Sequence, residues 1–206
     1  MKLSLHQREA LVEIVNIAFG RAASSLSGLA DRRVLLEVPK VSVRPIEELV
    51  EHLSGLVHWN VAAVHQEVLG ALPGDALLVQ TENSGILLTE MLTGAESHGS
   101  GLSLADQEVL NEIGNIVLHA CIGTIANTLG LSMMLKSPQV YVEDLQQILD
   151  RISHKRTEVH WGLVISTRFR LAQGPPAQDT EVSGYILMLL SVAFLDRLLE
   201  ALDALA

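Results

Sequence analysis

An eight-residue helical pattern that occurs twice constrains this chain more than any other feature. Residues 9–16 read Glu-Ala-Leu-Val-Glu-Ile-Val-Asn and residues 108–115 read Glu-Val-Leu-Asn-Glu-Ile-Gly-Asn, so both contain Glu-x3-Glu-x2-Asn. On a helix of about 3.6 residues per turn, these three polar positions lie within about 60° of one another. Apolar residues fill the opposite side. Each stretch therefore predicts a helix with one buried side and one narrow acidic and amide stripe.

The two stripes are candidate functional surfaces, and we name them by their residues. The first motif is Glu9, Glu13 and Asn16, and the second motif is Glu108, Glu112 and Asn115. The similarity extends beyond them, because an ungapped alignment of residues 5–43 with 104–142 matches further identical residues, among them Pro39 with Pro138. A unit with three strands is marginal alone. The 206 residues therefore predict one domain, 1–206, made of two repeats at about 1–95 and 101–206.

Local patterns predict the same order of elements in both halves. Ser4 and Ser103 are suited to cap the two motif helices, and the first helix is expected to end near Leu26 or at Gly28. Pro39 lacks an amide hydrogen and so predicts that the strand at 34–43, which contains it, is an edge strand or is bent. The remaining expected elements of the first half are a strand at 34–43, a short helix at 45–53, strands at 57–69 and 75–80, and a helix at 84–92. Those of the second half are a strand around Pro138, a short helix at 142–152, strands at 159–171 and 182–190 that join across 173–176, and a helix at 192–205.

Composition excludes several classes of function. The net charge of −10 argues against nucleic acid or an anionic membrane surface as a partner. The single cysteine, Cys121, excludes an internal disulfide, fits a reducing compartment and lies on the buried side of its predicted helix. The most apolar run, 185–195, is too short to span a bilayer, which takes about 20 residues. No metal-ligand spacing and no glycine-rich phosphate loop is present, so we expect no metal and no cofactor of its own. These features predict a soluble, cytoplasmic protein.

The two motifs resemble the signature of a known family. That signature is Asp or Ser, three residues, Glu, two residues, Asn, and then Pro after 21 or 22 residues. Here 22 residues separate Asn16 from Pro39 and Asn115 from Pro138. The chain is therefore identified as similar to the CheC family of chemotaxis phosphatases, which also includes the CheX proteins and parts of the flagellar switch. It departs from the signature at the first position, where Glu9 and Glu108 stand in place of Asp or Ser.

The resemblance implies both a fold and a substrate. The expected fold is α+β, with a six-stranded antiparallel sheet, internal two-fold pseudo-symmetry and two long exposed motif helices. The expected substrate is a phosphorylated CheY-like response regulator, which would bring its own Mg²⁺. Asn16 and Asn115 would each position the attacking water, as a glutamine does in GTP hydrolysis. Glu13 and Glu112 would grip the receiver lysine, and Glu9 and Glu108 would bind the substrate.

Two alternatives stay open from the sequence. The chain could be a non-catalytic binding module of the same family, or a weak phosphatase that sequesters its regulator or needs a CheD-like partner. The paired Glu and Asn residues favour the enzyme, because a scaffold does not need them. We also expect the second motif to be the stronger site, since Gly114 would let a partner backbone come closer than Val15 does.

Overall fold

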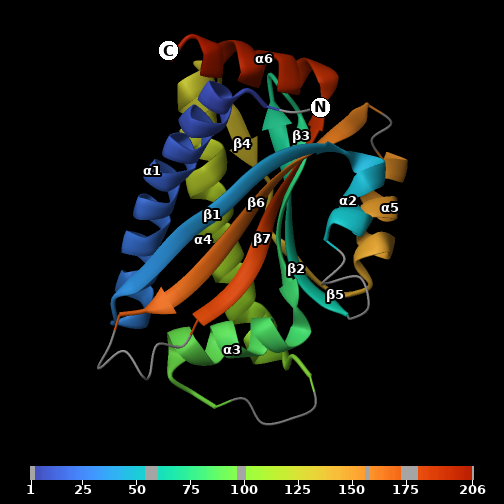
Figure 1. Ribbon diagram of the computed structural model, residues 1–206. Helices are drawn as coiled ribbons and strands as arrows, with labels where there is room; N and C mark the ends of the chain where they lie inside the picture. Colours follow the sequence, from blue (N-terminus) through green and yellow to red (C-terminus); the bar gives the residue numbers. More distant parts are fainter. Residues whose placement is uncertain (1–2, 54–59, 97–100, 156–157, 173–180, 206) are drawn as a thin grey trace.

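The first half runs in the order helix, strand, short helix, two strands, helix, and the second half follows the same order except that its first strand is split in two (Figure 1). The computed structural model describes residues 3–53, 60–96, 101–155, 158–172 and 181–205. The elements of the first half are α1 (Leu5–Ala30), β1 (Val34–Pro45), the 3₁₀ helix η1 (Ile46–Glu48), α2 (Leu49–His52), β2 (Val61–Gly70), β3 (Gly74–Thr81) and α3 (Glu82–Thr93). Those of the second half are α4 (Leu104–Leu129), β4 (Met133–Leu135), β5 (Gln139–Glu143), α5 (Leu145–Lys155), β6 (Val159–Leu171), β7 (Glu181–Ser191) and α6 (Val192–Asp203).

Serine residues cap both long helices. The Ser4 and Ser103 hydroxyls each accept a hydrogen bond from the backbone amide three residues further on, at 3.1 Å in both cases. The backbone amides of Ser4 and Ser103 in turn donate to the side-chain oxygens of Gln7 and Asp106, which completes two capping boxes. The predicted caps are confirmed. The expected end of the first helix is wrong, because α1 continues through Gly28 and stops only where Asp31 adopts φ 49°.

One antiparallel sheet joins the two halves. Its strand order is β1-β6-β7-β3-β2-β4, and β5 also pairs with β2. Every pairing is antiparallel, and β3 and β7 form the central pair. The α+β class with an antiparallel sheet is confirmed. β1 is an edge strand whose register shifts between Glu37 and Lys40. Pro39 lies between these two residues and, because it has no amide hydrogen, cannot donate to the ladder.

The sheet has seven strands, although it is six strands wide. β4 and β5 share the edge position beside β2, because the chain between them, which contains Pro138, leaves the ladder. The expected count of six therefore describes the width, and the proline splits the last strand. Exchanging the elements of the two halves leaves the strand order unchanged, which is compatible with the duplication. The duplication and the repeat boundaries stay predictions.

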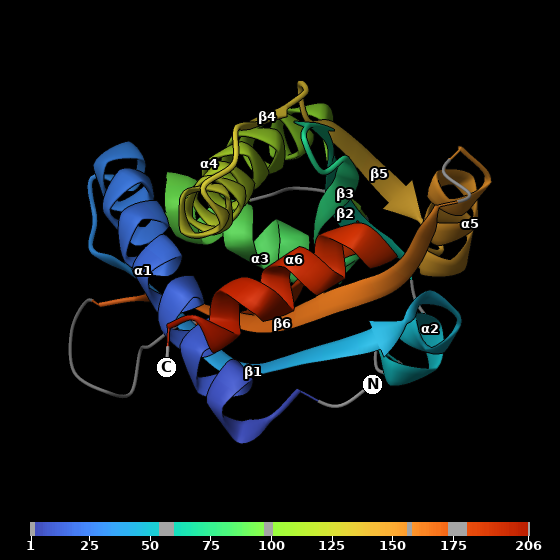
Figure 2. The ribbon, with the colours of Figure 1, turned by 90° about the horizontal axis from the view of Figure 1, so that it is seen from above.

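The two faces of the sheet carry different helices. On one face α1 and α4 lie side by side and α3 and α6 close the layer at its ends, whereas α2 and α5 pack on the other face (Figures 1 and 2). Alternate residues of each strand enter the two cores; in β2, Val64 faces the long helices and Ala63 faces α5. By length and composition α4 could cross a membrane, but here it packs on the sheet, with 56% of its most apolar window buried.

Two expected features lie outside the described residues. They are the start of the strand at 57–69, with its Val57-His58-Trp59 tripeptide, and the turn at 173–176. The described part of the first of these strands begins at Val61. The hairpin predicted at Leu72-Pro73-Gly74 is present between β2 and β3.

Close packing of α4 on β2 depends on Gly114. A β-carbon added at Gly114 would overlap the Val64 side chain, so no larger residue fits without moving the helix. We predict that Gly114→Ala lowers the free energy of unfolding by about 1–3 kcal/mol, as overpacking does. Gly123→Ala in the same helix is the matched control, because no atom lies within 4 Å of its added β-carbon. That control should be neutral or gain up to about 1 kcal/mol of helix propensity. Urea unfolding of both variants measures this difference, and equal stabilities would contradict the packing.

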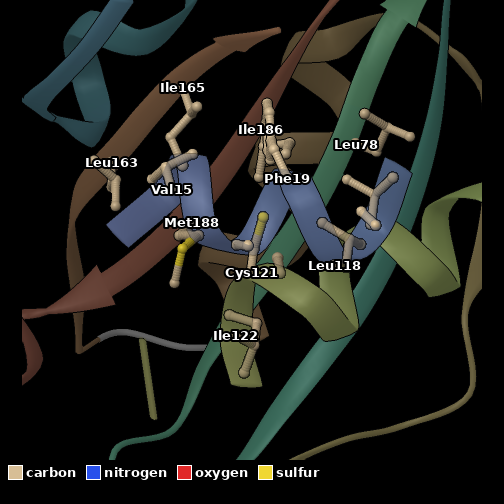
Figure 3. Close-up of a cluster of buried hydrophobic side chains, with 14 of the residues drawn as sticks. Val15, Phe19, Leu78, Leu118, Cys121, Ile122, Leu163, Ile165, Ile186 and Met188 are labelled. Carbon is tan, nitrogen blue, oxygen red and sulfur yellow. The ribbon is translucent and has the colours of Figure 1, made fainter. Parts of the chain in front are cut away.

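Cys121 lies in the core between the sheet and the long helices (Figure 3). It is 1% exposed, as expected, and burial raises the pKa of its thiol to about 12. At pH 8 the reactive thiolate would then be on the order of one part in 10⁴. We predict negligible reaction with a thiol reagent such as Ellman's reagent in the folded protein at pH 8, and one full equivalent after unfolding in urea. Rapid labelling of the folded protein would contradict the burial.

Candidate functional site

The first motif lies on the solvent side of α1. Glu9, Glu13 and Asn16 are all exposed, while Ile14 and Val15 between them are buried. Within the part of the chain that the structure describes, the Asn16 side chain makes no hydrogen bond. No protein group among the described residues therefore fixes the orientation of its carboxamide.

The second motif is anchored differently. Glu108 and Glu112 are exposed on α4, but Asn115 is half-buried. The Asn115 Oδ1 accepts a hydrogen bond from Gln66 Nε2 at 3.1 Å. Gln66 is 0% exposed in β2 and also donates to the backbone oxygen of Lys136 at 3.0 Å. The carboxamide of Asn115 is thus tied to the sheet, whereas that of Asn16 is not.

The packing of the two helices explains this difference. α4 contacts β2 and β3, while α1 packs chiefly along β1. Gly114 brings α4 so close to β2 that the next side chain, Asn115, reaches Gln66. The corresponding residue of α1, Val15, is part of the buried cluster (Figure 3). The expectation that Gly114 opens the surface to a partner backbone is wrong, because Gly114 is buried against Val64 of the sheet.

A shallow hollow lies between the two helices beside Asn115. Its volume is about 380 Å³, and its lining includes Arg21 of α1 with Asn115 and His119 of α4. Arg21 Nη1 lies 3.5 Å from Thr124 Oγ1, so the helices meet in the turns that follow the motifs. His119 Nδ1 lies 2.9 Å from the Asn115 backbone oxygen, which can only accept, so Nδ1 carries the hydrogen and donates. A cation and an imidazole therefore line the same hollow as Asn115.

The stripe carboxylates are available to a partner. Among the described residues, no ion pair involves Glu9, Glu13, Glu108 or Glu112. No group of three or more His, Cys, Asp and Glu side chains within those residues could hold a metal ion. The surface of α1 and α4 thus offers acids and amides in rows, with a single arginine between them in the hollow.

A larger hollow of about 490 Å³ lies on the opposite face of the sheet, between β2, β5 and α5. Its ionisable groups other than Glu158 already have partners within the protein. His65 Nε2 lies 2.8 Å from Asp75, Lys136 Nζ lies 2.6 Å from Glu67, and Arg151 lies 2.8 Å from Glu143. Because these contacts use the polar groups that a ligand would need, this hollow is a weaker candidate than the surface of α1 and α4.

Sequence reasoning identified the six motif residues but missed three neighbours: Gln66, Arg21 and His119. Arg21 lies five residues after Asn16 and His119 four residues after Asn115, and no local sequence pattern marks either of them as part of a site. Gln66 had one, because it stands between Val64 and Val68 at positions that point inward in an alternating strand. A buried glutamine needs a partner, although the sequence does not say which.

Known proteins similar to this chain are chemotaxis and flagellar-switch proteins. No protein-family model matches the chain. It is 23% identical over 139 residues to a putative CheY-P phosphatase CheC1 of Halobacterium salinarum, covering 67% of this chain and 70% of that protein. It is 24% identical over 140 residues to the CheY-P phosphatase CheC of Bacillus subtilis, covering 66% of each. It is 27% identical over 117 residues to the flagellar motor switch phosphatase FliY of Bacillus subtilis, covering 54% of this chain and only 30% of that longer protein.

Solved structures share the fold. FliY of Thermotoga maritima superposes with a TM-score of 0.76 at 18% identity, covering 99% of both chains. The FliM middle domain of H. pylori gives 0.60 at 12% identity, covering 97% of this chain and 99% of that one. The CheX–CheY–BeF₃–Mg²⁺ complex of Borrelia burgdorferi gives 0.50 at 14% identity, covering 84% of this chain and 96% of the matched chain. At these identities the likeness concerns the fold alone.

Proposed function

Because this chain belongs to the CheC family, we propose that it is a cytoplasmic phosphatase that hydrolyses the aspartyl phosphate of a CheY-like response regulator. Two relatives are named CheY-P phosphatases, and a protein of similar fold was solved with CheY. The observation that carries the proposal for this chain is that both Glu-x2-Asn pairs lie on the outer side of α1 and α4, with Glu13, Asn16 and Glu112 exposed and Asn115 half-buried. An exposed row of this kind can dock on another protein, whereas a buried one could not.

The reaction suits a surface without a pocket of its own. An acyl phosphate is already activated, so its hydrolysis needs a water held in line with the phosphorus and relief of the developing charge. The receiver would supply its own Mg²⁺ and lysine for that charge relief. The phosphatase has only to position the water.

Asparagine is chemically suited to hold the water. Its carboxamide both donates and accepts hydrogen bonds, stays neutral and so does not repel the phosphoryl oxygens. In this proposal Asn16 or Asn115 holds the water, one turn beyond Glu13 or Glu112. The glutamate pairs with the receiver lysine and sets the docking register. Glu9 and Glu108, a further turn back, contact the outer part of the receiver.

A non-catalytic binding module is the second candidate. FliM middle domains share the fold, and one of them was solved in a FliG–FliM complex. Fold alone therefore does not separate an enzyme from an assembly protein. The motif residues favour the enzyme, because a scaffold gains nothing from an amide one turn beyond each exposed acid. A CheD-like partner stays a proposal without an assigned surface.

Removing the motif amides tests catalysis directly. We predict that the wild-type protein accelerates the decay of a phosphorylated CheY-like receiver. Asn115→Ala should remove most of that acceleration, Asn16→Ala a smaller part, and the double variant all of it, a loss of about 10²-fold or more. Phosphate release over time measures the rates. Tight binding without any acceleration would favour the binding module, and full loss in Asn16→Ala with none in Asn115→Ala would reverse the assigned order of the sites.

Removing one motif charge tests docking. In an Asn16→Ala background we predict that Glu112→Gln lowers kcat/KM by about 10- to 100-fold, mainly through KM, because the lysine partner is lost. Glu51→Gln is the matched control, since Glu51 is exposed on α2 at the other face of the sheet. It changes the net charge equally without touching either motif. Similar effects of both variants would mean that only net charge matters.

A further inference from the structure

The buried glutamine of β2 interrupts the apolar face of its strand. Gln66 occupies a position that faces the long helices, where its strand neighbours on the same side are Val64 and Val68. An apolar residue would fit that pattern. Among the described residues, the Gln66 Oε1 has no hydrogen-bond partner, although it is buried. An unsatisfied buried oxygen lowers stability, so this residue calls for another explanation than stability.

The orientation of two carboxamides follows from one backbone atom. The Lys136 carbonyl oxygen can only accept, so the Gln66 atom at 3.0 Å from it is Nε2. The same Nε2 lies 3.1 Å from Asn115, whose contacting atom must then be the acceptor Oδ1. The NH₂ group of Asn115 is therefore on the side away from Gln66. Within the described residues no hydrogen bond occupies its two donors or the second lone pair of Oδ1, so these are left for a partner.

The matching position of the other half is apolar. Gln66 pairs with Ala76 in β3, five residues before Thr81, the residue that caps α3. Ile165 pairs with Ile186 in β7, five residues before Ser191, which caps α6. Ile165 is fully buried in the same core. The fold therefore accepts an aliphatic residue at this place, and only the half that lies under Asn115 carries the amide.

We propose that Gln66 is a positioning residue, which fixes the Asn115 carboxamide with its NH₂ group directed outward and thereby makes the second motif the better-ordered site. This inference rests on the proposed phosphatase function. An amide that is already oriented loses less rotational freedom when it binds the attacking water than a free one does. Asn16 has no such support, so its carboxamide loses rotational freedom each time the receiver binds.

A matched pair of variants isolates the role of Gln66. Gln66→Met keeps the length of the side chain and removes the donor, while Gln80→Met makes the same change in β3. Gln80 is 1% exposed, lies on the same face as Leu78, and makes no side-chain hydrogen bond within the described residues. Thermal denaturation first establishes that both variants are folded. In an Asn16→Ala background, we expect Gln66→Met to lower kcat about 10- to 100-fold with little change in KM, and Gln80→Met to leave both constants unchanged.

A readout that does not need activity separates this inference from the proposed function. The side-chain ¹⁵N–¹H heteronuclear NOE should show a rigid Asn115 amide and a mobile Asn16 amide in the wild-type protein, and Gln66→Met should mobilise Asn115. If Asn115 is already as mobile as Asn16 in the wild type, or if Gln66→Met changes neither its mobility nor kcat, the positioning role is wrong. If no receiver is dephosphorylated yet Asn115 is rigid only when Gln66 is present, the phosphatase function fails and the positioning role holds.

Discussion

The contact between Gly114 and Val64 determines how the second motif differs from the first. Because Gly114 has no side chain, α4 lies directly on β2, and Asn115 reaches a hydrogen-bond donor inside the sheet. Val15 stands at the corresponding place in α1, which packs chiefly on β1, and Asn16 faces solvent. Two side-chain differences thus decide whether the motif asparagine is anchored or free. In the helix, Gly114 stands where α1 has Val15, and in the strand, Gln66 stands where the other half has Ile165. The packing of the helix on the sheet therefore sets how well the carboxamide that would hold the attacking water is oriented.

Gln66 connects that packing to the rest of the site. It joins α4 to the segment between β4 and β5, since it bonds both Asn115 and the Lys136 carbonyl. Lys136 precedes Pro138 by two residues, and Pro138 is the proline of the motif spacing. The spacing therefore has a physical counterpart in the second half, where the asparagine and the segment before the proline are bound to the same buried side chain. An aliphatic residue there would pack as well, as Ile165 does in β6.

Much of the fold follows from local sequence signals. Ser4 and Ser103 mark the helix starts, Pro39 marks an edge strand, and Leu72-Pro73-Gly74 marks a hairpin, because each acts through the chemistry of a few adjacent residues. The end of α1 at Ala30 and the split of the last strand depended on contacts beyond their own segments. The link from Asn115 to Gln66 joins a helix to a distant strand, and no local pattern encodes such a pair. For the same reason the sequence misled about Gly114, whose neighbour is the sheet and not a partner.

The proposed function requires that the outer surface of α1 and α4 receives a phosphorylated receiver domain. The most direct measurement is the structure of a complex between this protein and a CheY-like receiver activated with beryllofluoride and Mg²⁺. We predict that the receiver binds to α1 and α4, with the Asn115 amide facing the beryllofluoride group and Glu112 opposite a receiver lysine. A receiver bound on the α2 and α5 face, with both motifs left in solvent, would contradict it.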